Sequence, residues 1–188
     1  MPAEVVKAQP DSAVAPEAGP KIETKIYRGE RTRHFKLSHT KLEVRFDWQK
    51  QQVLGNAILT LAPYFYPQSH VLLDAKGFEI HEIARVPGDS IEVLQYDYDG
   101  KMIDIDLGKV YRKGQTVNLN INYTANPNGM NDKDSVANDK KGLYFINPTG
   151  SESGKPQGIW TQGETNSNSR WFPTIDAPNQ KTTQEVYI

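Results

Sequence analysis

The chain has 188 residues, 22 basic and 23 acidic side chains, a formal net charge of −1 and no cysteine. The balanced charge gives no broad field to attract a polyanion, which argues against a nucleic-acid-binding protein, and the lack of cysteine excludes disulfide bonds and thiolate metal sites. No apolar run approaches the length of a membrane-spanning helix, so no membrane span is expected.

Composition divides the chain into a lead-in over residues 1–36 and a domain over residues 37–188. The first twenty residues are rich in Ala, Pro, Val and Glu without periodicity, and such a composition buries too little apolar surface to offset the entropy of ordering. The basic patch that follows is interpreted as solvated; it comprises Arg28, Arg31, Arg33, His34 and Lys36. We therefore predict a flexible Pro/Ala-rich tail and lead-in. Such a start suits a mature exported protein, so we favour a periplasmic or otherwise exported location.

Alternation of apolar and polar residues with period two predicts β-strands throughout residues 37–188. Over residues 42–48 every even position is apolar and every odd position is charged, and a return over 53–60 makes a hairpin. Asp99-Gly100 suits a tight turn between strands over 91–98 and 103–107, because both residue types tolerate positive φ. Further strands are predicted over 71–73, 78–83, 117–123, 142–146 and 183–188. Turn signals recur roughly every 8–12 residues, which indicates an all-β fold built as an antiparallel β-sandwich or saddle.

The strand pattern over residues 183–188 has no turn after it. A natural domain seldom ends inside such a pattern. We therefore expect that the domain is truncated at its C-terminal end and that the unfinished strand leaves an edge prone to pairing.

Sequence patterns for metal binding are incomplete. His81-Glu82 would begin a His-Glu-x-x-His zinc motif, but Arg85 occupies the fifth position and the chain's four histidines are not closely spaced. Asp132-Lys133-Asp134 lacks the Gly and distal Glu of a calcium loop and is predicted to be a surface loop. We therefore predict no metal site in this chain.

Sequence patterns for catalysis are also incomplete. Asp104 and Asp106 share one face of a strand but are interpreted as solvent-facing carboxylates rather than a glycosidase pair. No serine lies in a Gly-x-Ser-x-Gly elbow, and no histidine follows His81. We predict no catalytic residue in this chain.

The stretch TQGETNSNSRWFPTIDAPNQKTT, residues 161–183, is the best candidate for a ligand-contacting segment. Gln162 and Glu164 flank Gly163, so an extended backbone would direct both side chains to one side, with the glycine leaving room for a close ligand. An amide beside a carboxylate suits the first residue of a peptide and its ammonium group. An exposed polar patch at the end of a strand is the alternative.

The run from Trp160 to Val186 resembles the signature near the end of the N-terminal β-domain of zinc aminopeptidases of the aminopeptidase N type. That family has Thr-Gln-x-Glu, then Arg-x-Phe-Pro-x-x-Asp-x-Pro, and later Lys-x-Thr. The matching residues are Thr161, Gln162, Glu164, Arg170, Phe172, Pro173, Asp176, Pro178, Lys181 and Thr183. The similarity continues upstream through Gly142-Leu143-Tyr144 and covers roughly residues 37–188.

This resemblance implies the N-terminal, substrate-contacting domain of a zinc-dependent aminopeptidase that removes N-terminal residues from peptides. Gln162 would line the pocket for the first side chain of the substrate, and Glu164 would help to bind its free α-ammonium. The residues implied to shape the loop are Arg170, Phe172, Pro173 and Asp176. The family's Gly-x-Met-Glu-Asn and His-Glu-x-x-His motifs are absent from this chain. Zinc is therefore expected in a downstream catalytic domain, and this chain alone is expected to be inactive.

Two alternatives remain open from the sequence. A non-catalytic relative would keep the β-domain for protein contacts after losing its zinc ligands. An independent β-sandwich binding module could instead bind carbohydrate through Tyr64-Phe65-Tyr66, which lies between two prolines.

Overall fold

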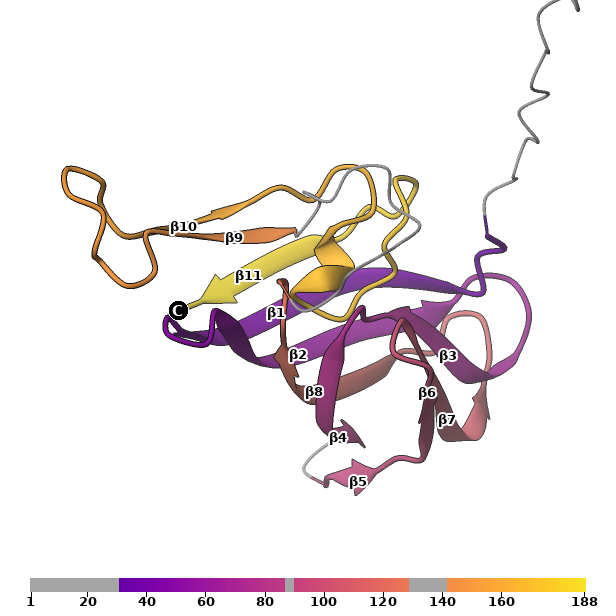
Figure 1. The fold of residues 1–188 in the computed structure, drawn as a ribbon. Coiled ribbons are helices and arrows are strands. Elements are labelled where there is room, and N and C mark those ends of the chain that lie inside the picture. The colour runs from indigo at the N-terminus through magenta and orange to yellow at the C-terminus, as the bar shows by residue number, and fades with distance from the viewer. Residues whose placement is uncertain (1–30, 87–89, 129–141) are drawn as a thin grey trace, which may run out of the picture. The chain divides into compact units, whose positions relative to one another are not determined.

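The computed structural model describes residues 31–86, 90–128 and 142–188, and within them the secondary structure is almost entirely β (Figure 1). The strands are β1 (Phe35–Asp47), β2 (Gln52–Pro63), β3 (Gln68–Asp74), β4 (Phe78–Arg85), β5 (Glu92–Val93), β6 (Tyr96–Tyr98), β7 (Met102–Tyr111), β8 (Val117–Ala125), β9 (Leu143–Ile146), β10 (Gly158–Thr161) and β11 (Thr183–Tyr187). A single turn of 3-10 helix, η1 (Asn168–Arg170), precedes β11. The all-β prediction is confirmed.

The strands form one large sheet, one small sheet and a two-stranded ribbon. The large sheet has the order β11-β1-β2-β8-β4-β5, the small sheet the order β3-β7-β6, and the ribbon consists of β9 and β10. All neighbours pair antiparallel except β1 and β11, which run parallel from His39↔Thr183 to Glu43↔Tyr187. The predicted antiparallel sandwich is therefore correct apart from this one pair, in which β11 is the edge strand.

The core lies between the large and the small sheet. Because side chains alternate across a strand, each strand presents one apolar row to this interior. The completely buried members of these rows are Leu37, Leu42, Val53, Ala57, Leu59, Leu61, Val71, Leu73, Ile83, Ile103, Ile105, Leu107, Leu119, Ile121 and Ala125. The alternation in the sequence therefore identified the inward face of these strands correctly.

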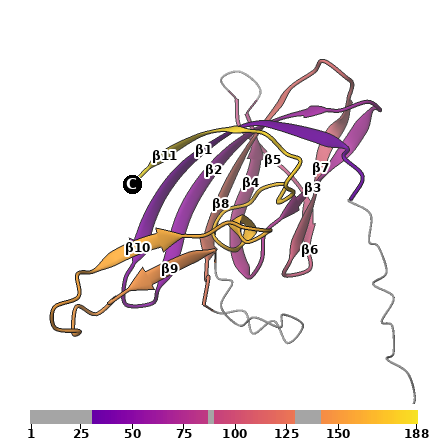
Figure 2. The same ribbon diagram turned by 90° about the horizontal axis from the view of Figure 1, so that it is seen from above.

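The ribbon β9–β10 covers a second part of the large sheet, away from β3, β6 and β7 (Figure 2). Phe145 of β9 packs edge-on against Phe46 and Trp48 at the end of the β1–β2 hairpin, with ring centroids 6.1 and 5.7 Å apart. Ile159 of β10, which pairs with Phe145, also packs against the core. The inner face of the ribbon is therefore anchored, and its other face points away from the sheet.

The hairpin predicted at Asp99-Gly100 is confirmed as the turn between β6 and β7. Gly100 has φ of +87°, and an Asp99 carboxylate oxygen accepts bonds from the N–H groups of Lys101 (2.8 Å) and Met102 (2.6 Å). These two backbone bonds, the Met102 bond first, hold the pKa of Asp99 below its usual value.

Two strand boundaries differ from the sequence prediction. The segment 91–98 forms two short strands instead of one. Its first part pairs with β4 as far as Val93, Leu94 is then buried, and the second part pairs with β7 from Tyr96. In β4 a register shift between Ile80 and Glu82 breaks the alternation. The ribbon strand β10 was not predicted at all.

The predicted tail over residues 1–36 lies mostly outside the described residues, as do Asp132-Lys133-Asp134. Within the described part of the chain, residues 32–188 form one compact unit. None of the described residues forms a helix long and apolar enough to cross a membrane.

Candidate functional site

Gln162 and Glu164 lie at the surface, immediately after β10. The N–H of Gln162 donates to the Gly142 carbonyl at 2.9 Å, which extends the β9–β10 pairing by one step. Both side chains are exposed. A Cβ on Gly163 would overlap the side-chain amide of Asn168, so the space on this side of the glycine is filled by Asn168 and is not left open for a ligand as the sequence analysis expected.

The outward face of the ribbon places an aromatic pair beside Gln162. Trp160 pairs in register with Tyr144, and their rings lie 5.2 Å apart at 40°. Trp160 is 54% exposed although its backbone is in a strand. Because side chains alternate along a strand, Gln162 is expected on the same face as Trp160. Gly142, which lies opposite Gln162, has no side chain that could cover it. The sequence analysis missed this pair; the signal was an apolar aromatic residue two positions before Gln162.

Backbone bonds hold the segment after Glu164 against the turn between β3 and β4. The Ser167 N–H donates to the Gly163 carbonyl at 2.9 Å and closes the turn into η1. Lys76 donates twice, from its backbone N–H to the Ser169 carbonyl (2.7 Å) and from its ammonium to the Asn166 carbonyl (2.8 Å). The loop that carries Glu164 is therefore tied to a strand connection far away in sequence.

Asp176 joins η1 to the end of β3. One of its carboxylate oxygens accepts from the Ser169 N–H (2.9 Å) and the Ser169 hydroxyl (2.7 Å), while its own N–H donates to a carboxylate oxygen of Asp74 (2.9 Å). Asp74 and Thr174 exchange two further backbone bonds of 2.7 and 3.0 Å. Ser169 is completely buried, so this carboxylate satisfies donors that water does not reach.

Apolar residues anchor the same segment in the core. Phe172 and Pro173 are buried, and Arg170 is buried beside them at the end of η1. The Tyr123 hydroxyl donates to the Trp171 carbonyl at 3.0 Å, and its ring stacks on Phe78. Burial in this apolar setting raises the pKa of Tyr123.

The histidines lie apart within the described residues. His39 contacts Thr183 and Glu185, His70 contacts Asp104 at 3.0 Å, and His81 contacts Thr124 at 2.9 Å. No group of three His, Cys, Asp or Glu side chains among the described residues is arranged to hold a metal ion. The donor set described here therefore does not fit a zinc ion, which takes three or four such ligands.

Arg85, which occupies the fifth position of the partial zinc motif, has a structural role instead. Its guanidinium donates to the Leu107 carbonyl at 2.8 Å and the Tyr111 hydroxyl at 3.3 Å, and forms an ion pair with Glu92. The Glu92 bond, above all, raises the pKa of Arg85. Arg85 thus links β4, β5 and β7.

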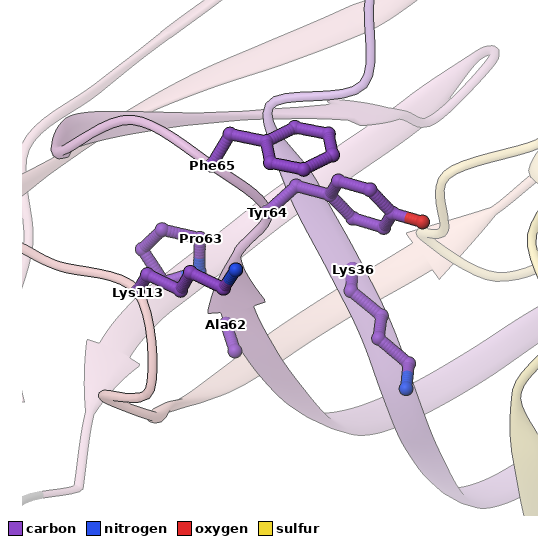
Figure 3. Close-up of a pocket in the computed structure, with 6 residues that line it drawn as sticks. All are labelled: Lys36, Ala62, Pro63, Tyr64, Phe65 and Lys113. Atoms are coloured by element: carbon purple, nitrogen blue, oxygen red, sulfur yellow. The ribbon is translucent and has the colours of Figure 1, made fainter.

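Two residues of the aromatic run after β2, Tyr64 and Phe65, line an open pocket of about 410 Å³. Tyr64 is half-buried, Phe65 is 63% exposed and Tyr66 is 76% exposed. The lining residues are Lys36, Ala62, Pro63, Tyr64, Phe65 and Lys113 (Figure 3). This pocket is formed by different residues from those around Gln162.

Solved structures share this fold. A mutant M1 zinc metallopeptidase from Deinococcus radiodurans, bound to a Tyr-Ser-Ala substrate, matches with a TM-score of 0.62 and 17% identity over 82% of this chain and 32% of that one. Native leukotriene A4 hydrolase from Saccharomyces cerevisiae matches with a TM-score of 0.60 and 19% identity over 81% of this chain and 23% of that one. The chain thus spans a third or less of these proteins. No curated protein sequence matches.

The sequence itself matches one family over nearly all of the described domain. The matched region is residues 31–188, and the family is described as the Peptidase M1 N-terminal domain. It contains the two sheets, the ribbon and the whole segment from Thr161 to Thr183. This chain belongs to the Peptidase M1 N-terminal domain family, which forms part of M1 metallopeptidases.

Proposed function

We propose that this chain forms one wall of the substrate site of a zinc-dependent aminopeptidase, which removes N-terminal residues from peptides. The main support is the exposed position of Gln162 and Glu164 on a loop whose other side is fixed by Asp176 and Phe172. Exposed polar groups on a braced backbone are suited to meeting a ligand without reorganisation.

In this proposal Glu164 binds the α-ammonium of the peptide and Gln162 contacts the first side chain. A carboxylate and an ammonium about 4 Å apart attract each other by roughly 4 kcal/mol at an effective dielectric of 20. An internal or acylated peptide nitrogen carries no charge, so this contact selects free N-termini. Glu164 is exposed in this chain, and the attraction reaches that strength only when a second domain excludes water from the site.

The zinc ion belongs, in this proposal, to a catalytic domain that partners this one. The described residues offer no suitable set of ligands, whereas similar folds occur in proteins named as zinc metallopeptidases. When bound there, the metal would supply the hydrolytic chemistry. The contribution of this chain is to bind and orient the N-terminus of the peptide, so we expect no hydrolysis by the isolated chain.

The test is Glu164→Gln in the full-length protein, with Glu79→Gln on β4 as the control. Gln keeps the shape of the side chain and loses its charge. We therefore expect kcat/KM for a peptide with a free N-terminus to fall roughly 30- to 1000-fold, which corresponds to a loss of about 2–4 kcal/mol in transition-state stabilisation. The Glu79 side chain is 77% exposed in another strand, and its variant should match the wild type. Unchanged kinetics for Glu164→Gln would remove this residue from the site. A folded full-length protein without any peptidase activity would instead indicate the non-catalytic relative.

A further inference from the structure

The pocket at the end of β2 is formed by two aromatic rings at a steep angle. The rings of Tyr64 and Phe65 are 4.6 Å apart between centroids and 72° apart in orientation, so they form a corner rather than a parallel slot. The N–H of Tyr64 donates to the His34 carbonyl at 2.8 Å, and Pro63 is buried beneath. The backbone that carries the rings is therefore held in place while the Phe65 ring stays largely exposed.

Three cationic residues, Lys113, Lys36 and Arg33, lie near this corner. The Lys113 ammonium lies 5.7 Å from the Phe65 ring centroid and is directed toward the two rings in Figure 3. Lys36 also lines the pocket, with its ammonium directed away from the two rings in Figure 3, and the Arg33 guanidinium lies 4.7 Å from the Tyr64 ring centroid. Among the residues that the structure describes, no carboxylate lines the pocket, and the segments 32–38, 60–67 and 109–117 contain no Asp or Glu. The local charge is positive in a chain whose net charge is −1.

We propose that this pocket binds an acidic saccharide, with the apolar face of a uronate sugar ring in the corner of Tyr64 and Phe65 and its carboxylate on Lys113. A pyranose chair is puckered and presents C–H groups on more than one side, which suits two rings at 72°. A nucleobase is flat and stacks best on a parallel ring face. The lining also has no amide or carboxylate side chain that would read a base edge.

The size and chemistry of the pocket suit a small ligand. Its volume of about 410 Å³ lies in the lower part of the range for small-molecule sites. Apolar rings supply contact area, and the ammonium groups supply charge that a neutral sugar would leave unused. This site is separate from Gln162 and Glu164, so it does not depend on the proposed peptidase role.

The experiment is an NMR titration of the 188-residue chain with trigalacturonic acid in a buffer without phosphate. The matched ligand is the same trisaccharide with every carboxylate methyl-esterified, which keeps the rings and removes the charge. We expect amide shifts at residues 36, 62–65 and 113, at least fivefold weaker binding of the ester, and weaker binding as salt rises. A mononucleotide is the third ligand.

Two variants and two controls test the geometry. Phe65→Ala and Lys113→Gln should each weaken trigalacturonate binding at least fivefold. Tyr66→Ala removes a neighbouring exposed ring, and Lys109→Gln a neighbouring cation; neither side chain lines the pocket, and both variants should bind within twofold of the wild type. All four positions have exposed side chains, and preserved amide dispersion would show that each variant is folded. The proposal is overturned if the ester binds equally well, if the mononucleotide binds more tightly, or if no shift occurs at millimolar ligand.

Discussion

The Asp176→Ala variant tests whether one carboxylate fixes the candidate site loop. In the wild type, the Asp176 carboxylate accepts hydrogen bonds from both the N–H (2.9 Å) and the hydroxyl (2.7 Å) of the completely buried Ser169. Each donor left unsatisfied in a buried position costs about 1–3 kcal/mol, and Asp176 is itself only half-buried, so water should recover part of the loss. We expect a loss of about 2–4 kcal/mol in the free energy of unfolding. For a domain of this size that corresponds to a fall in Tm of roughly 5–15 °C.

The measurement is urea denaturation of the 188-residue chain, followed by tryptophan fluorescence. Ser169→Ala removes one of the two donors and should cost about 1 kcal/mol. Because the two residues share a bond, the double variant should be more stable than the sum of the single losses predicts, by about 0.5–1.5 kcal/mol. Asp97 is an exposed carboxylate on β6, so Asp97→Ala should change the free energy of unfolding by less than about 0.5 kcal/mol. A loss that small for Asp176→Ala, or strictly additive losses, would refute the reasoning.

Two further predictions concern the buried ring of Tyr123. A Cβ on Gly55 would overlap this ring, which is held by its stack on Phe78 and by its bond to the Trp171 carbonyl. Gly55→Ala should therefore lower the free energy of unfolding, measured by urea denaturation, by about 1–3 kcal/mol. This cost should shrink in a Tyr123→Ala background, and an equal cost there would contradict the steric reason. Burial, as the largest cause, raises the pKa of both Tyr98 and Tyr123. The folded state therefore favours the neutral phenols. Their contribution to the free energy of unfolding is fully present below the unfolded pKa of about 10 and is lost as pH rises through the folded pKa. Absorbance at 295 nm of the folded protein should show phenol titration above the ordinary pKa of about 10 that is reduced in Tyr98→Phe. This variant should also lose less stability between pH 9 and pH 11 than the wild type, and an equal loss would contradict the reasoning.

The sequence predicted the parts of the fold that local alternation determines. In β8 the alternation of Val117, Leu119 and Ile121 with asparagines identified the buried row, because side-chain direction in a strand depends only on position. The turn at Asp99-Gly100 was also local, since it requires only positive φ and a side-chain acceptor. Such features can be read without knowing which strands are neighbours.

The features that the sequence did not predict depend on distant partners. The break at Leu94 occurs because the chain leaves one sheet for another, and the parallel pairing of β1 with β11 joins segments more than 140 residues apart. The bond from the Asp176 N–H to Asp74 spans 102 residues. Gln162 and Glu164 could be named as candidates from the motif, but no local pattern indicated that Lys76 and Asp74 brace their loop.

The contacts around η1 bear on how the proposed site would work. On one side of this segment, Phe172 and Ser169 are buried and bonded, so their positions are fixed before any ligand binds. On the other side, Gln162 and Glu164 are exposed. A charged side chain on a fixed backbone loses less conformational entropy on binding than one on a mobile loop, and each ordered residue saves about 1–2 kcal/mol of backbone entropy. In the proposed site, the buried half of the motif would therefore contribute to peptide binding without touching the peptide. It follows that variants of Asp176 should weaken substrate binding at the proposed site through the position of Glu164, although Glu164 precedes η1 in the chain and Asp176 follows it.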